Sequence, residues 1–151
     1  MPKPRTTLKQ SPADFRVAEQ IDFPLTGHGE HLWCYVEKTG LNTAWLKREW
    51  ARLTGCAPKD IAHSGLKDRH AITRQWLSLP AKHGVQLPDS GDGWRILERH
   101  LNERKLRVGA HRHNQFAIAL RDIDADPTAI ESALAELARD GFPNYFGEQR
   151  F

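Results

Sequence analysis

A short polar segment, residues 65–70, places an acidic side chain between two basic ones. Asp68 lies between Lys67 and Arg69, in a loop that Gly65 opens. Two neighbouring cations favour the carboxylate and lower its pKa. An ionised aspartate in a cleft can act as a nucleophile or as an electrostatic stabiliser. The local sequence leaves open a second interpretation, an exposed and salt-bridged turn, which is the commoner occurrence.

A second segment, residues 141–151, combines aromatic side chains with amide and guanidinium groups. It contains Phe146 between Asn144 and Gln149. Such a set can stack on a flat ring and form hydrogen bonds to its edge, as nucleobase sites do. The alternative is an aromatic packing segment.

Basic residues are concentrated between positions 99 and 113, where Glu103 is the single acidic residue. The block includes Arg104, Lys105 and Arg107, which can contact phosphates or form a solvated face. Lys9 precedes the first strand in a turn, where a lysine can reach a phosphate or a carboxylate but most often meets only water.

The residue types needed for metal or cofactor chemistry are not grouped. Cys34 and Cys56 form no C-x-x-C, and the histidines have no accompanying ligand set. There is no P-loop and no G-x-G-x-x-G. We therefore expect neither a metal nor a cofactor. The cysteines lie among apolar residues and are expected to be buried and reduced, as in a cytoplasmic protein.

The elements that must position these groups follow from hydrophobic periodicity. Alternation of apolar and polar residues predicts about six strands, and capping residues predict two helices. The clearest strands are 15–21, 32–37, 71–79, 94–101 and 115–122, the last with Phe116, Ile118 and Leu120 facing inward. The helices run from Asn42 or Thr43 to Gly55 and from Asp126 to Gly141, and residues 80–93 are predicted to form a surface loop. The fold class is α+β, with a mixed, largely antiparallel sheet and helices packed on it.

Length and composition limit the function classes. The chain has 151 residues, of which 39% are hydrophobic, and this suits one domain or part of a larger one. No apolar run is long enough to span a bilayer, and no secretory signal precedes the first strand. The formal net charge of +3 does not by itself indicate a nucleic-acid partner.

Taken together, several motifs resemble the TruD family of pseudouridine synthases. The most specific are a G-x-K-D-x-x-A-x-T-x-Q run at residues 65–75 and an N-x-F-G-x-Q-R-F run at residues 144–151. Further matching segments are residues 9–19, 27–31, 42–43, 105–109 and 114–116, together with Lys38, in collinear order along nearly the whole chain.

The resemblance implies a role for each matching site residue. Asp68 corresponds to the catalytic aspartate, Lys9 to a lysine near it, and Phe146 to the ring that stacks on the target uracil. The residues implied to bind substrate are Asn144, Gln149, Lys67, Arg104, Lys105 and Arg107. The implied reaction isomerises a uridine of tRNA, at position 13 in the D-arm, to pseudouridine without a cofactor. Whether Asp68 attacks the ribose or removes a proton stays open.

The resemblance also implies what the chain lacks. Residues 1–151 correspond to the N-terminal part of a pseudouridine-synthase catalytic domain and end within the N-x-F-G-x-Q-R-F run. The second half of the sheet and an inserted domain are absent. A half-sheet has an unpaired edge, which predicts either self-association or pairing with a missing complementary piece. An alternative is a truncated, inactive fragment that still binds RNA, and a third is a fragment with neither property.

Overall fold

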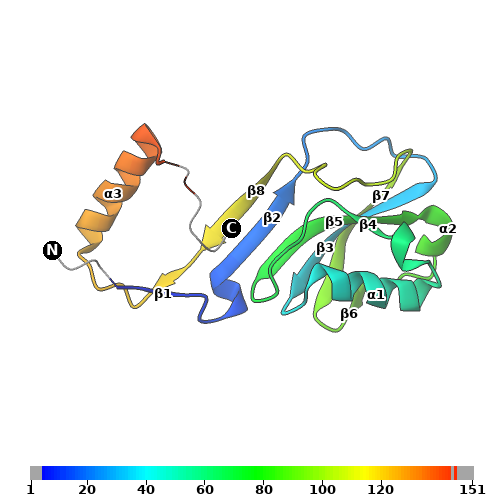
Figure 1. The fold of residues 1–151 in the computed structure, drawn as a ribbon, viewed down its shortest axis with the longest axis horizontal. Coiled ribbons are helices and arrows are strands. Elements are labelled where there is room, and N and C mark those ends of the chain that lie inside the picture. Colours follow the sequence, from blue (N-terminus) through cyan, green and yellow to red (C-terminus); the bar gives the residue numbers. More distant parts are fainter. Residues whose placement is uncertain (1–4, 144, 146–151) are drawn as a thin grey trace. The chain divides into compact units, whose positions relative to one another are not determined.

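The computed structural model describes residues 5–143 and residue 145, and the chain divides into two compact units (Figure 1). The larger unit is Leu8–Ala119, and the smaller combines Met1–Thr7 with Leu120–Phe151. The candidate aspartate therefore belongs to the larger unit. Within the described residues, no helix has the length and apolar character that crossing a bilayer would require.

The larger unit is built on one mixed sheet with the strand order β6-β7-β3-β5-β2-β8, and β4 pairs beside β5. Neighbours are antiparallel except for β2 and β5, which run parallel. The strands are β2 (Phe15–Gln20), β3 (His31–Thr39), β4 (Ala62–His63), β5 (Ile72–Pro80), β6 (Ser90–Gly91), β7 (Trp94–Asn102) and β8 (His113–Ile118). This architecture confirms the predicted α+β fold with a mixed, largely antiparallel sheet.

One face of the sheet is covered by helix α1 (Thr43–Thr54), as Figure 1 shows. Asn42 caps the helix by accepting a hydrogen bond from the Trp45 amide at 2.7 Å, and Gly55 ends it in a left-handed conformation. Leu46 and Trp50 are fully buried against strand residues that include Cys34, Val36, Leu77 and Leu79. Both cysteines are free and buried, as predicted.

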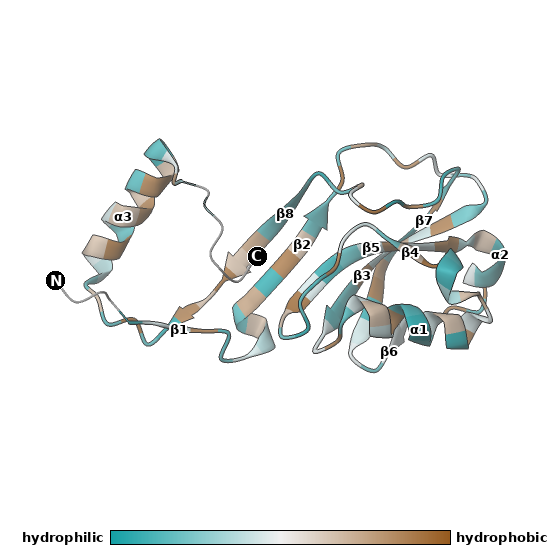
Figure 2. Ribbon diagram, viewed as in Figure 1, coloured by the Kyte–Doolittle hydropathy of each residue, from teal (hydrophilic) through white to brown (hydrophobic). Residues whose placement is uncertain are grey.

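The opposite face has a smaller aromatic cluster around Trp33 and Trp76, which Leu106 covers. Figure 2 shows hydrophilic and hydrophobic residues alternating along β2, as a strand with two different faces requires. Two short 3-10 helices, η1 (Pro12–Asp14) and η2 (Pro58–Asp60), connect these elements.

The prediction of a surface loop at residues 80–93 was wrong, because this segment contains α2 (Ala81–Gly84) and β6. Leu87 is buried in the main core, and the Arg99 guanidinium donates to the Leu87 carbonyl and to the Asp89 carboxylate, both at 2.8 Å. The burial of Leu87 and the hydrogen bonds from Arg99 on β7 order this segment, although its composition is typical of loops.

The inward orientation predicted for Phe116, Ile118 and Leu120 was also wrong. These residues are 56%, 48% and 48% exposed. β8 lies at one edge of the sheet, and among the described residues its only strand partner is β2. Alternation identified an apolar face correctly, but it cannot show whether a second layer covers that face.

The smaller unit contains Thr7 of β1 (Thr7–Leu8) and the whole of β9 (Leu120–Arg121). These two strands form a short ladder, and α3 (Pro127–Asp140) follows β9. The predicted caps are confirmed: the Asp126 carboxylate accepts from the Thr128 amide at 3.1 Å, and Gly141 ends the helix at a φ of 73°. None of the described α3 residues is buried, and Leu134 and Leu137 of its apolar stripe are 60% and 46% exposed.

Candidate active site

The structure brings together two of the predicted site residues, Lys9 and Asp68. The Lys9 ammonium lies 3.0 Å from a carboxylate oxygen of Asp68, although 59 positions separate the two in sequence. Lys9 immediately precedes the turn into η1 and β2, and Asp68 lies in the loop between β4 and β5. The Asp68 side chain is 58% exposed, so its carboxylate is accessible to a large substrate.

The Lys9 backbone adopts a left-handed φ of 55°, which is uncommon for a residue with a side chain. Such a conformation costs on the order of 1 kcal/mol and persists where surrounding contacts impose it. The ammonium also lies 3.9 Å from the centroid of the Phe15 ring, within range of a cation–π interaction. The ring and the carboxylate together hold the Lys9 head group in place.

A buried ion pair lies directly beside the candidate aspartate. The Lys67 ammonium contacts a carboxylate oxygen of Glu19 at 2.6 Å, and their side chains are 5% and 0% exposed. The second oxygen of Glu19 accepts from the Trp76 amide at 2.9 Å. The Lys67 charge, which was implied to contact substrate, is paired and shielded from solvent in this structure. Lys67 instead fixes the loop to β2.

Lys38, near the end of β3, holds the main chain of the same loop. It is almost fully buried, and its ammonium donates to the main-chain carbonyls of Leu41 at 2.5 Å and Asp68 at 3.1 Å. Burial, assisted by the nearby Lys67 charge, lowers the pKa of Lys38 to about 8. Lys38 therefore positions the main chain of Asp68 and leaves the carboxylate to Lys9.

Neutral side chains complete the support of the loop. Gln75 on β5 accepts from the Thr43 hydroxyl at 2.9 Å and donates to the Gly65 carbonyl at 3.0 Å. The same Thr43 hydroxyl accepts from the Lys67 amide at 3.2 Å. The Thr43 and Gln75 side chains are buried, and these hydrogen bonds satisfy their polar atoms. They therefore fix the loop to the sheet and to α1 without leaving an unpaired buried polar group.

Ser64, immediately before the loop, is held by His111. The Ser64 hydroxyl accepts from the His111 amide at 2.8 Å and lies 2.5 Å from the ring nitrogen Nδ1 of the same histidine. A Cβ added at Gly65 would come within 2.9 Å of the His111 ring. This close approach explains the glycine at position 65.

The cation beside the Asp68 carboxylate is not one of its sequence neighbours. Lys67 is engaged by Glu19, and the Arg69 guanidinium donates to the Gly40 carbonyl at 3.3 Å. Lys9, distant in sequence, supplies the ammonium instead. The local sequence predicted Lys67 and Arg69 as the partners of Asp68, but successive residues of a loop point in different directions and these two side chains engage other groups.

The structure does not bring Arg104 and Lys105 to this pair. The Arg104 carbonyl accepts a hydrogen bond from the Trp33 indole at 2.7 Å. Trp33 precedes Lys38, which contacts the Asp68 main chain, by five residues of β3, and five residues of extended strand span about 17 Å. The Lys105 ammonium donates to the Lys59 carbonyl at 3.0 Å. Arg107 is exposed in the turn that leads to His111.

The remaining predicted site residues, Asn144, Phe146 and Gln149, lie outside the described residues. Among the residues that are described, no group of three or more His, Cys, Asp or Glu side chains could hold a metal ion. Sequence reasoning gave no role in the site to Glu19, Lys38, Thr43 or Gln75. The sequence feature that could have identified them is a polar residue at an inward-facing position of a strand or at the first position of a helix.

Comparisons with known proteins agree along the whole chain. A family model described as tRNA pseudouridine synthase D (TruD) matches residues 2–151. The tRNA pseudouridine synthase D of Ectopseudomonas mendocina is 49% identical over 150 residues, covering 97% of this chain and 43% of the relative. That of Azotobacter vinelandii is 50% identical over 147 residues, covering 95% and 42%.

A solved structure gives the same result. The crystal structure described as tRNA pseudouridine synthase D from Methanosarcina mazei superposes with a TM-score of 0.81 at 29% identity, covering 97% of this chain and 35% of that one. The chain thus spans less than half the length of the relatives that it matches.

Proposed function

Because the chain belongs to the TruD family of tRNA pseudouridine synthases, we propose that it supplies the aspartate side of an active site that isomerises a uridine of tRNA. The observation that carries this proposal is the Lys9–Asp68 pair: an accessible carboxylate on a main chain that buried side chains fix from three directions. Such pre-organisation is what a catalytic group requires.

The proposed reaction moves the ribose from one atom of uracil to another. The bond between C1′ of the ribose and N1 of the base breaks, and a bond between C1′ and C5 forms. The C5 hydrogen is released as a proton, and N1 gains one. The target base must leave its stack, which costs a few kcal/mol. Asp68 either attacks the ribose or assists proton removal.

Lys9 has an electrostatic role in this proposal. Its ammonium lies 3.0 Å from the Asp68 carboxylate and would supply the positive charge beside that group during the reaction. The side chain of Phe146 would stack on the uracil, and those of Asn144 and Gln149 would bind its edge. Arg104, Lys105 and Arg107 would contact tRNA phosphates, which position RNA without reading its sequence. The D-arm uridine at position 13 is the proposed target.

The length of the relatives bears on what the chain can do alone. We propose that residues 1–151 form the N-terminal part of a catalytic domain, and that the exposed edge of β8, with Phe116 and Ile118, pairs with another polypeptide or with a second copy. For the chain alone, RNA binding without isomerisation is a second candidate, because it spans less than half of its relatives. The buried free cysteines suit a reducing compartment, so we propose the cytoplasm.

The test of function uses this chain and a chimera extended to family length with the remaining sequence of the Ectopseudomonas mendocina relative. Each is incubated with a tRNA transcript, and pseudouridine is mapped by carbodiimide labelling. Modification by the chimera that is lost in Asp68→Ala, but kept in the exposed control Asp92→Ala, supports the proposal. Modification that survives in Asp68→Ala contradicts it.

Size-exclusion chromatography tests the edge. We expect the chain to elute above its monomer mass of 17.2 kDa, and Ile118→Lys to restore the monomer. Monomeric elution of the unsubstituted chain with a cooperative melt would contradict self-association.

A further inference from the structure

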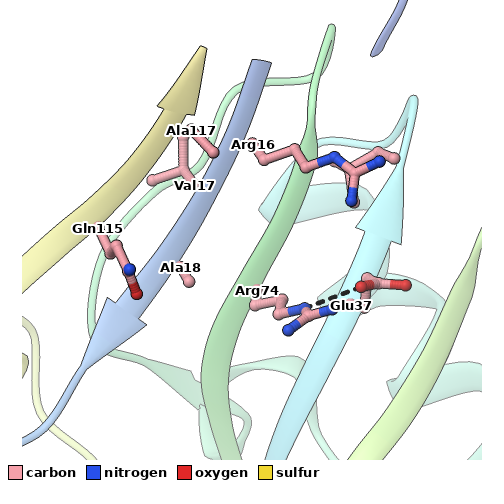
Figure 3. A pocket seen from close by; sticks show the side chains of 8 residues that line it. Arg16, Val17, Ala18, Glu37, Arg74, Gln115 and Ala117 are labelled. Carbon is pink, nitrogen blue, oxygen red and sulfur yellow. Dashed lines mark hydrogen bonds and ion pairs between the residues drawn. The ribbon is translucent and has the colours of Figure 1, made fainter. Parts of the chain in front are cut away.

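A shallow cavity lies on the sheet face opposite the Lys9–Phe15 contact. Its volume is about 180 Å³, and it is lined by residues of four adjacent strands, β8, β2, β5 and β3 (Figure 3). The register places Ala18 beside both Arg74 and Gln115, and Arg16 beside both Ile72 and Ala117. Small side chains thus form the floor, and long polar side chains surround it.

Positive charge predominates around this cavity. Glu37 accepts from Arg74 at 2.8 Å and from Arg95 at 3.0 Å, so one carboxylate serves two guanidinium groups. Burial opposes ionisation of Glu37, but the hydrogen bonds from Arg74 and Arg95 outweigh it and lower the pKa of this carboxyl. Arg16 adds a third guanidinium, whose Nε donates to the Ala13 carbonyl at 3.2 Å. Within the described part of the chain, Arg16 forms no ion pair.

The arrangement fixes the arginines and leaves them accessible. The Glu37 side chain is only 15% exposed, whereas those of Arg74 and Arg95 are 45% and 61% exposed. An arginine has five N–H donors in a rigid fork, and Glu37 engages only some of them. The carboxylate therefore orients two forks, and their remaining donors face solvent. Oriented guanidinium groups match the geometry of a phosphate.

We propose that Arg16, Arg74 and Arg95 form a phosphate-binding surface for the RNA backbone, separate from the Lys9–Asp68 site. The surface lies at the same end of the sheet as the candidate aspartate, because Arg16 follows Phe15 and Ile72 begins β5 four positions after Asp68. Alternation along β2 directs Arg16 and Phe15 to opposite faces. RNA bound at both sites would therefore pass around the start of β2 and β5.

This inference rests on the proposed function for the identity of the RNA, but its test does not require catalysis. Binding of a fluorescent tRNA transcript to the chain is measured by anisotropy between about 50 and 200 mM salt. The test variant is the double substitution Arg16→Gln and Arg95→Gln, which leaves the Arg74–Glu37 hydrogen bond in place. The matched control is Arg52→Gln, which removes an exposed arginine on α1 that is paired with Glu49.

Each lost phosphate contact should weaken binding roughly fivefold to tenfold and reduce the salt slope by about 0.7–0.9. We expect both effects for the double variant and neither for Arg52→Gln. Equal affinities and slopes for the double variant and the control overturn the inference, as does an unsubstituted chain that shows no salt-dependent tRNA binding. Circular dichroism confirms that each variant is folded.

A second arm distinguishes RNA from a free anion. If inorganic phosphate raises the thermal midpoint of the chain but not that of Arg16→Gln, while tRNA affinity is the same for both, the surface binds a free anion and the RNA assignment is wrong. A third arm separates this inference from the proposed function. Failure of the family-length chimera to modify tRNA refutes the proposed function. The binding experiment uses the 151-residue chain, so its result tests the phosphate-binding surface independently of catalysis.

Discussion

Breaking the buried Glu19–Lys67 pair should destabilise the larger unit strongly. Lys67→Met removes the ammonium that lies 2.6 Å from the Glu19 carboxylate, in surroundings where the two side chains are 5% and 0% exposed. Among the described residues, the carboxylate then retains the Trp76 amide as its hydrogen-bond donor, at 2.9 Å. Leaving one partner of a buried pair uncompensated costs about 3–5 kcal/mol, whereas an exposed pair contributes about 0–1 kcal/mol.

Urea unfolding followed by tryptophan fluorescence measures this loss. All five tryptophans lie within Leu8–Ala119, so their emission reports the larger unit specifically. The control Arg112→Met breaks the exposed Arg112–Asp22 pair, which has a 2.8 Å contact, and should cost less than about 1 kcal/mol.

A double variant separates the charge from the packing. Glu19→Gln combined with Lys67→Met removes both charges, and the glutamine carbonyl can still accept from the Trp76 amide. We expect it to recover most of the stability that Lys67→Met loses, with a coupling free energy of about 2 kcal/mol or more. A loss below about 1 kcal/mol for Lys67→Met alone would refute the reasoning, because the pair would then behave like one at the surface.

Three further predictions concern the support of the Asp68 loop and the cap of the neighbouring helix α1. Because burial lowers the pKa of Lys38 from 10.5 to about 8, the unfolded chain holds this proton more tightly, and the free energy of unfolding should rise from pH 8 to pH 10.5. Lys38→Met should lack that rise in urea unfolding at several pH values, and an equal rise in both proteins would contradict the assignment. Gly65→Ala places a Cβ 2.9 Å from the His111 ring and should cost about 1–3 kcal/mol by thermal unfolding; a neutral result would show that the loop yields. Asn42→Ala removes the cap on the Trp45 amide and should cost about 1 kcal/mol, whereas an unchanged midpoint would mean that the cap is dispensable.

Much of the fold could be predicted because local signals agreed with tertiary packing. The caps at Asn42 and Gly55 fixed α1 to within a residue, and alternation located β2 and β5. The errors arose where the outcome depended on distant residues. Leu87 and Arg99 order the segment that looked like a loop, and no local pattern reports such partners.

The sequence singled out Asp68 as a candidate site residue, but it did not predict the side chains that hold the Asp68 loop in place. Asp68 stood out because of its neighbours, yet their charges are directed to Glu19 and Gly40, and the effective partner is Lys9. Buried polar residues such as Lys38 resemble ordinary charged residues in a sequence. Only the pairing of strands shows that the Lys38 ammonium meets the Asp68 carbonyl.

The most direct test of the account follows the hydrogen at C5 of uracil. Forming the bond between C1′ and C5 releases that hydrogen, so tRNA that contains uridine tritiated at C5 should lose tritium to water. The family-length chimera should release tritium with Asp68 present, and Asp68→Asn should reduce release to background while Asp92→Asn leaves it unchanged. Tritium release that persists in Asp68→Asn would show that this carboxylate is not the catalytic group.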